Sequence, residues 1–145
     1  MSHLLAIDQL RGGYGHVEVL RGVDLHVDAG EVVALLGSNG AGKSTLNNTV
    51  CGLFPAWSGR VVFDGVELTR AHYKDVVRAG LIQVPEGRRV FPNLTVLENL
   101  ELGSFRRARE RRAANIDKAF AIFPRLKERE TQLAGTLSVA RYWCS

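Results

Sequence analysis

One segment of the sequence combines glycines, a lysine and a serine at a spacing that suits phosphate. Gly37 is followed by four residues and then by Gly42, Lys43 and Ser44. Glycines permit a tight turn in which successive backbone N–H groups point inward and surround phosphate oxygens. In this pattern the lysine reaches the β- and γ-phosphates, and the serine hydroxyl binds magnesium. The segment is therefore predicted to be a P-loop that holds a nucleoside triphosphate, ATP in the first place, together with Mg²⁺.

The flanks of this loop predict the strand–loop–helix arrangement that it needs. The apolar run at residues 32–36 is typical of a buried strand. A helical pattern over residues 43–53 follows, so the positive end of a helix dipole would face the phosphates. Thr45 is assigned to the α-phosphate side. The predicted nucleotide-binding residues of this segment are Gly37, Ser38, Asn39, Gly40, Ala41, Gly42, Lys43, Ser44 and Thr45.

The rest of the chain is predicted to alternate strands with helices, which indicates a mixed α/β domain. Thr95 and Glu98 form a capping-box pattern that opens a helix towards Leu102. Pro124 is expected to end a preceding helix. The other predicted elements are strands at 4–10, 17–27, 60–63 and 81–84, turns at 12–15, 28–31 and 64–65, and helices at 71–79 and 106–123.

The P-loop by itself does not separate kinases, GTPases and ATPases, but the residues before it do. The stretch 10–44 resembles the start of an ABC-type ATPase, the motor subunit of ATP-binding-cassette transporters. Tyr14 occupies the position at which that family stacks an aromatic ring on adenine; the alternative is a turn tyrosine packed at a sheet edge. The resemblance covers residues 4–138. It implies an α/β P-loop NTPase fold of the ABC ATPase type, N-terminal half only: an antiparallel β subdomain, the P-loop core and the start of the helical subdomain.

Residues 85–91 narrow the resemblance to one group within that family. Their sequence Pro-Glu-Gly-Arg-Arg-Val-Phe is similar to the ATP-binding subunits of branched-chain amino acid importers. Glu86 stands where most of the family has a glutamine that reaches the magnesium and the attacking water, and Gln83 is not a natural substitute for it. Glu86 is interpreted as a magnesium ligand or water-orienting group. The alternative is a solvated carboxylate that pairs with Arg88 or Arg89 and contributes about 0–1 kcal/mol.

The resemblance also implies partners and a location, and it indicates that the family's domain is incomplete in this sequence. The implied cofactors are ATP and Mg²⁺, and the implied partners are membrane permease subunits and a second ATP-binding subunit, at the cytoplasmic face of the cell membrane. The family's signature should continue after Ser138, but residues 139–145 do not match it. Residues 1–138 are therefore interpreted as an incomplete ATP-binding domain and residues 139–145 as a divergent tail, for which a frameshift or early stop is one hypothesis.

Several parts of the family's catalytic set are not recognised in this sequence. Signature, Walker B carboxylates and switch histidine are all missing from the pattern, so no complete catalytic set is predicted. The chain is expected to bind ATP without hydrolysing it alone. It is also expected to be only marginally stable, with an unpaired hydrophobic edge at residues 32–36.

Composition and charge are those of a soluble globular protein and do not indicate a nucleic-acid-binding protein. The sequence is 46% hydrophobic and 23% charged, as in soluble globular proteins. A net charge of +4 permits contact with phosphate without requiring nucleic acid. The arginine-rich residues 106–112 include a glutamate and no aromatic platform, so a solvated helix face is predicted there and no nucleic-acid partner. The alternatives kept open are a nucleotide-binding module without catalysis and an ABC ATPase of another substrate class.

Overall fold

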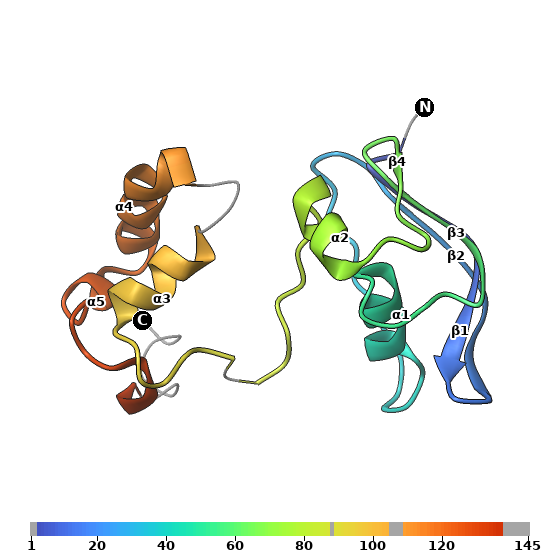
Figure 1. The fold of residues 1–145 in the computed structure, drawn as a ribbon, viewed down its shortest axis with the longest axis horizontal. Coiled ribbons are helices and arrows are strands. Elements are labelled where there is room, and N and C mark those ends of the chain that lie inside the picture. The colour runs from blue at the N-terminus through green and yellow to red at the C-terminus, as the bar shows by residue number, and fades with distance from the viewer. Residues whose placement is uncertain (1–2, 88, 105–108, 138–145) are drawn as a thin grey trace. The chain divides into compact units, whose positions relative to one another are not determined.

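The computed structural model describes residues 3–87, 89–104 and 109–137. The chain divides into two compact units, Met1–Val84 and Pro85–Ser145, both drawn in Figure 1. The divergent tail predicted at residues 139–145 lies outside the described residues. The first unit contains the P-loop, and the second contains the segment with Glu86.

The first unit is built on a four-stranded antiparallel sheet with the order β2-β1-β3-β4. The strands are β1 Leu5–Tyr14, β2 Val17–Val27, β3 Ser58–Phe63 and β4 Val66–Glu67. The predicted strand at residues 17–27 is confirmed, and its side chains Val23 and Leu25 pack against the core as their alternation indicates.

Helix α1, Lys43–Val50, lies on one face of this sheet (Figure 1). Its Leu46 and Val50 belong to the core of the unit. The helix is shorter than the predicted 43–53, because Gly52 has a left-handed φ of 71° that ends the turn. A second helix, α2 Tyr73–Ala79, places Val76 fully inside. The sheet residues of the core are Ile7, Leu10, Leu20 and Val61.

The first hairpin is longer than the sequence indicated. The prediction of a turn at residues 12–15 is wrong, because β1 continues to Tyr14 and the turn itself is Gly15–His16. The register pairs Gly13 with Glu18. A side chain at Gly13 would overlap the carbonyl of Val17. Gly12 pairs with Leu20, so the register skips Val19 here, and glycine allows the two backbones to approach closely at this irregularity.

Two predicted strands do not form. Residues 32–36 have no strand, and their Val32 and Leu36 are 95% and 92% exposed. Residues 81–84 have none either, and Val84 is 91% exposed. A buried strand of this type requires a neighbour on each side. No segment of the described chain pairs with either run, so both predictions of strand were wrong for this structure.

The second unit is helical. The capping box at Thr95 and Glu98 is confirmed, with both of its reciprocal hydrogen bonds present. The predicted helix 106–123 begins later, and residues 105–108 lie outside the described residues. Pro124 follows the end of α4 as expected and opens α5, where a proline has no N–H to lose. The elements are α3 Val96–Gly103, η1 Arg109–Arg111, α4 Arg112–Ile122, α5 Pro124–Lys127 and η2 Ala134–Thr136.

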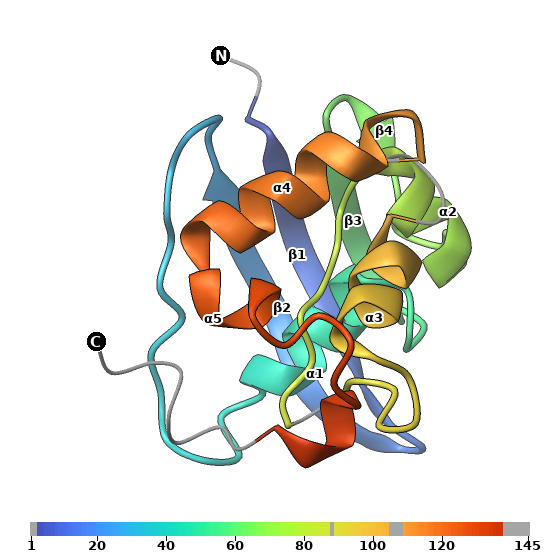
Figure 2. The same cartoon turned by 90° about the vertical axis from the view of Figure 1, so that its left-hand side faces the viewer.

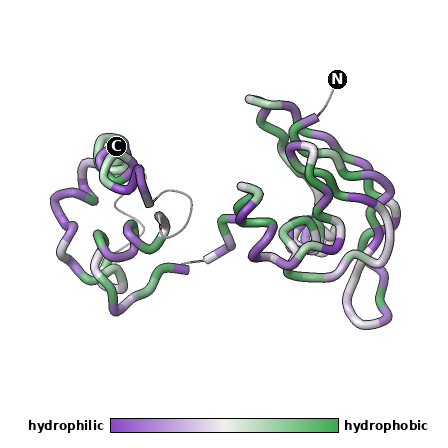
Figure 3. The backbone as a smooth tube through the Cα atoms, turned by 45° about the horizontal axis from the view of Figure 1, so that its top comes forward, coloured by the Kyte–Doolittle hydropathy of each residue, from purple (hydrophilic) through white to green (hydrophobic). Residues whose placement is uncertain are grey.

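The interior of this second unit is small. Val96, Phe120 and Ala134 are its buried apolar residues among those described. Thr95 and Leu133 form an isolated antiparallel bridge that joins the start of α3 to the segment before η2. Figure 2 shows the helices of this unit face on, and Figure 3 shows hydrophobic segments in both units.

Candidate functional site

The backbone of the P-loop has the conformation that its glycines predict. Gly40 and Gly42 have φ angles of 88° and 94°, in the left-handed region that favours glycine. The N–H of Ala41 donates to the carbonyl of Ser38 at 3.2 Å, which closes a tight turn. Gly42 then caps α1 without any side-chain acceptor. The loop therefore delivers the chain directly into a helix N-terminus.

The N–H groups at this helix start have no acceptor of their own. Among the described residues, none accepts a hydrogen bond from the backbone N–H of Gly40 or Gly42, or from those of Lys43, Ser44 and Thr45. The first turn of α1 contains no acidic side chain. Unsatisfied N–H groups and the positive end of the helix dipole together favour an anion. The geometry can therefore bind phosphate oxygens through the main chain.

Lys43 supplies the positive charge of the loop. Its Nζ donates to the carbonyl oxygens of Gly37 at 2.6 Å and Ser38 at 2.8 Å. The ammonium group thus lies beside the loop, within reach of a group bound there. An ionised phosphate oxygen is a stronger acceptor for an ammonium than a neutral carbonyl. Lys43 therefore lies beside the loop that is predicted to hold the β- and γ-phosphates.

The two hydroxyl residues of the site have different surroundings. Ser44 is exposed, and no hydrogen bond within the described chain involves its hydroxyl. Thr45 is 4% exposed, and its Oγ1 donates to the hydroxyl of Tyr14 at 3.1 Å. Ser44 therefore suits a metal ligand, whereas the hydroxyl of Thr45 is already engaged with Tyr14.

Tyr14 lies at the end of β1, next to the start of α1. Its side chain is 47% exposed, and its ring meets the ring of Phe54 edge to face, with centroids 5.2 Å apart. Residues 31 positions apart in the sequence, Tyr14 and Thr45, are thus in contact. An aromatic ring that is half exposed beside a phosphate-binding loop offers a surface for a planar base. Phe54 was missed by sequence reasoning, because its contact arises from the loop after α1.

The β1–β2 hairpin also packs on the loop itself. A Cβ added at Gly42 would lie 3.0 Å from Cγ1 of Val19. Glycine is therefore favoured at position 42 for two reasons: its backbone is left-handed, and a side chain there would press on Val19. No feature of the sequence alone indicates which strand meets the loop.

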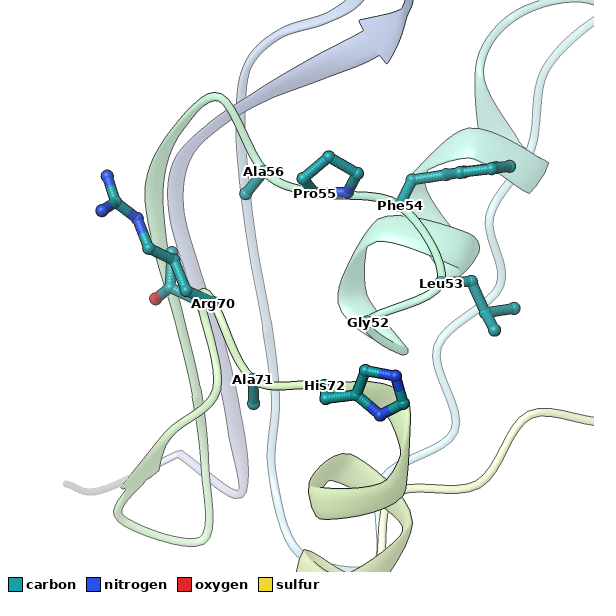
Figure 4. A pocket seen from close by; sticks show the side chains of 9 residues that line it. Gly52, Leu53, Phe54, Pro55, Ala56, Arg70, Ala71 and His72 are labelled. Carbon is teal, nitrogen blue, oxygen red and sulfur yellow. The ribbon is translucent and has the colours of Figure 1, made fainter.

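A pocket of about 430 Å³ lies elsewhere in the same unit, between the segment after α1 and the segment before α2 (Figure 4). Its lining includes Phe54, Arg70 and His72, and none of residues 37–45. The candidate phosphate site is therefore separate from this pocket.

Glu86 belongs to the second unit and is exposed. The Nε of Arg89 donates to the main-chain oxygen of Glu86 at 3.4 Å, and the described residues contain no ion pair to its carboxylate. Arg88, the other partner considered, lies outside the described residues. Gln83, in contrast, is tied to α1, because its Nε2 donates to Oδ1 of Asn48 at 3.2 Å.

Asn99 fixes the loop that follows Glu86, and sequence reasoning did not identify it. Its Oδ1 accepts from the N–H of Phe91 at 2.9 Å, and its Nδ2 donates to the carbonyls of Phe91 at 3.1 Å and Thr95 at 2.9 Å. One side chain of α3 therefore holds the segment from Phe91 to Thr95 on the helix. The feature of the sequence that could have identified Asn99 is its position four residues after Thr95, the residue that caps α3.

Comparison with known proteins gives a consistent set of relatives. The family model described as ABC transporter matches residues 20–141. The high-affinity branched-chain amino acid transport ATP-binding protein BraG of Pseudomonas aeruginosa is 44% identical over 135 residues, which are 93% of this chain and 58% of that protein. The xylose import ATP-binding protein XylG of Escherichia coli O157:H7 is 37% identical over 106 residues, which are 72% of this chain and 21% of that protein.

Solved structures give the same picture of the fold. An ATP-binding cassette of an ABC transporter aligns with a TM-score of 0.77 and 27% identity, over 96% of this chain and 60% of that chain. An ATP-binding subunit of an ABC transporter aligns with a TM-score of 0.77 and 31% identity, over 93% of this chain and 56% of that chain. The predicted P-loop NTPase fold of the ABC ATPase type is confirmed. Within the described residues, no helix has the length and apolar character needed to cross a bilayer.

Proposed function

Because the chain belongs to the ABC transporter family, we propose that it binds MgATP at residues 37–45 as an ATP-binding subunit of a branched-chain amino acid importer. The observation that carries the nucleotide part is the start of α1. Its N–H groups have no acceptor within the described chain, and Lys43 places an ammonium group beside them. Backbone donors, helix dipole and cation together favour a polyanion.

Magnesium fits the oxygen ligands that the loop offers. Mg²⁺ prefers a few protein oxygens, with water and phosphate completing an octahedron. The exposed hydroxyl of Ser44 would be one ligand. On the resemblance alone, we assign Glu86 as a magnesium ligand or as a group that orients water. The ion would supply charge neutralisation for the phosphates, while the protein's own residues bind and orient them.

Tyr14 is proposed as the surface for the adenine ring. Its half-exposed ring and its bond to Thr45 support this assignment. Stacking of a base on an aromatic side chain contributes about 1–3 kcal/mol in nucleic-acid complexes. A nucleotide would thus contact the chain at two points, its phosphates at the loop and its base at Tyr14.

The transported solute and the partners are proposed from the relatives. Similarity to BraG covers 93% of this chain, and this favours branched-chain amino acids. The resemblance to ABC motors adds membrane permease subunits and a second ATP-binding subunit, at the inner face of the membrane, as proposed partners. Similarity to XylG makes a sugar importer the second candidate. Uptake of labelled leucine and labelled xylose by cells with and without the gene would separate the two.

The proposed role for this chain alone is binding without turnover. Residues 1–145 contain no Asp-Glu pair after an apolar strand, the arrangement that the resemblance associates with activating water. Phosphoryl transfer requires a positioned water as well as charge neutralisation. Phosphate release from ATP by the chain alone would contradict this part of the proposal.

Titration calorimetry with ATP, with and without Mg²⁺, tests the site itself. The Lys43→Ala variant is expected to bind MgATP at least about tenfold more weakly, since hydrogen bonds to charged groups contribute about 1.5–3 kcal/mol. Lys74→Ala, a lysine of α2 outside the loop, serves as the control and should bind normally. Equal affinity of wild type and Lys43→Ala would contradict the site.

The assignment of Glu86 has a separate test. Glu86→Gln removes the charge and keeps the shape of the side chain. If Glu86 binds the ion, the gain in ATP affinity on adding Mg²⁺ should shrink, whereas Glu128→Gln should leave this gain unchanged. A variant with the same magnesium dependence as wild type would remove the ligand role.

A further inference from the structure

Near the middle of strand β1, the regular alternation of side chains between the two faces of the sheet is interrupted. Side chains of a regular strand alternate, so residues two apart share a face. Ile7 and Leu10 are 2% and 0% exposed, and both belong to the same core although they are three residues apart. The strand therefore carries one extra residue between them.

After Leu10 the alternation of β1 is regular again, so Gly12 and Tyr14 lie on the same face of the sheet as Leu10. A Cβ added at Gly12 would lie 3.7 Å from Oγ1 of Thr49 in α1. Two residues further on, Tyr14 contacts Thr45, also in α1. Without the extra residue, alternation from Ile7 would turn Tyr14 to the opposite face of the sheet. The irregularity in the middle of β1 thus determines that Tyr14 meets the P-loop helix.

The extra residue is a β-bulge at Gln9. Asp8 and Gln9 of β1 lie opposite one residue of β2, Asp24, in the register of the two strands. Gln9 has a φ of 46°, in the left-handed region that residues with side chains rarely adopt. This conformation must therefore be held by its surroundings.

Asp24 provides that hold. Its Oδ1 accepts from the backbone N–H of Gln9 at 2.6 Å, and its Oδ2 accepts from the side-chain Nε2 of the same residue. Both bonds are charge-assisted, and both go to one residue. The carboxylate thus fixes the backbone and the side chain of Gln9 together.

Glycines on both neighbouring strands leave room for this bulge. Gly22 of β2 and Gly59 of β3 have φ angles of 84° and 93°. A Cβ at Gly22 would lie 3.0 Å from Oε1 of Gln9, and a Cβ at Gly59 would overlap the main-chain carbonyl of Gln9. The three strands are therefore built around one irregular position.

We propose that Gln9 and Asp24 are positioning residues that keep Tyr14 on the P-loop face of the sheet. The inference rests on the proposed function, because Tyr14 matters only if a nucleotide binds there. A slip of register by one residue turns every later side chain of a strand to the other face. Bulges beside binding sites commonly re-aim a side chain in this way.

The test compares two ligands that differ in the base. ATP contacts the loop and Tyr14, whereas inorganic tripolyphosphate contacts the loop alone. In Asp24→Ala the affinity for MgATP should fall about tenfold, within the range for one base on an aromatic ring, while that for magnesium tripolyphosphate stays unchanged. A general loss of folding would weaken both ligands by the same factor.

Two further variants test whether Asp24 acts through its hydrogen bonds to Gln9 or through its negative charge. Asp24→Asn keeps an oxygen for the N–H of Gln9, and its Nδ2 can donate to Oε1 of Gln9 once that side-chain amide turns over, so this variant should bind MgATP like wild type. Asp8→Ala removes a neighbouring carboxylate that makes no side-chain hydrogen bond within the described chain, and it should also bind normally. Should Asp24→Ala fail to fold, Gln9→Ala removes the side-chain bond alone and should show a smaller loss for ATP only.

A structural readout decides the inference independently of nucleotide. Nuclear Overhauser contacts between the rings of Tyr14 and Phe54 should be present in wild type and Asp24→Asn, and lost in Asp24→Ala. If wild type binds neither ligand, the proposed function is wrong. The ring contacts then show by themselves whether Asp24 keeps Tyr14 on the P-loop face of the sheet. Contacts that persist in Asp24→Ala, or equal losses for ATP and tripolyphosphate, would overturn the inference.

Discussion

Gly42 shows how tightly single residues of the loop are constrained. Its φ of 94° lies in the left-handed region, and a Cβ there would lie 3.0 Å from Val19. The same residue caps α1, whose first N–H groups have no acceptor among the described residues. Backbone conformation, packing of the hairpin and phosphate binding therefore depend on one position.

We predict that Gly42→Ala lowers both stability and nucleotide affinity. The left-handed conformation costs a residue with a side chain about 1–2 kcal/mol, and the contact with Val19 adds to this. Urea unfolding should show the loss of stability, and titration calorimetry the loss of affinity. Gly65→Ala is the matched control, because Gly65 has a φ of 75° but nothing within 4 Å of an added Cβ. An equal loss of stability in both variants would show that Val19 contributes nothing.

Tyr14 combines two roles that substitution can separate. Tyr14→Phe removes the hydroxyl that accepts from Thr45 and keeps the ring. We expect a stability loss of about 0.5–1.5 kcal/mol, the usual contribution of one hydrogen bond, with affinity for ATP maintained. Tyr14→Ala should weaken ATP binding as well. If Phe and Ala weaken ATP equally, the hydroxyl rather than the ring contacts the nucleotide.

The start of helix α3 contains a carboxylate, Glu98, whose pKa is shifted by its hydrogen bonds. Hydrogen bonds from the backbone N–H and then the hydroxyl of Thr95 lower the pKa of Glu98 below its usual 4.5. A carboxylate with a depressed pKa stabilises the fold above its unfolded-state pKa, and this contribution is lost as pH falls through the folded value. Acid should therefore weaken the start of α3.

The measurement is the free energy of unfolding between pH 3 and pH 7, read against helix content. Wild type should lose stability at the acid end of this range, and Glu98→Gln should lose less, because glutamine keeps the capping box without titrating. Glu101→Gln, in the same helix, should follow wild type. Parallel curves for wild type and Glu98→Gln would contradict a role for this carboxylate.

Some elements could be predicted because their signals are local. Thr95 and Glu98 define a helix start by spacing alone, and the glycines before Lys43 define the loop. Contacts between distant residues could not be predicted in this way. The ring contact of Tyr14 with Phe54 depends on how the loop after α1 folds back, and the bulge at Gln9 depends on an aspartate 15 residues later.

The wrong strand predictions have a related cause. An apolar run shows that a segment favours an apolar environment, but not which neighbour supplies it. Residues 32–36 and 81–84 were read correctly as hydrophobic and wrongly as paired. The apolar side chains of residues 32–36 therefore remain available for pairing in this structure, whereas in residues 81–84 the N–H of Leu81 already donates to Val76 and the side chain of Gln83 to Asn48.

At the scale of the whole molecule, exposed apolar side chains stand out in two segments. Val32 and Leu36 are 95% and 92% exposed, and Ile82 and Val84 are 71% and 91% exposed. Unpaired extended segments with hydrophobic side chains are templates for pairing with another chain. Grouped apolar surface of this kind also favours association. Both features predict that the chain by itself does not stay monomeric.

We expect the chain alone to self-associate as its concentration rises, because pairing would satisfy backbone groups and cover apolar side chains in one step. Replacing Val32 and Leu36 together by lysine should reduce this association, since charge on an extended segment opposes pairing. Val66→Lys, at a position that is 52% exposed in β4, is the matched control and should associate like wild type. Sedimentation velocity over a concentration series measures the effect. A wild-type chain that stays monomeric throughout, or a double variant that associates as strongly, would show that residues 32–36 are not the surface responsible.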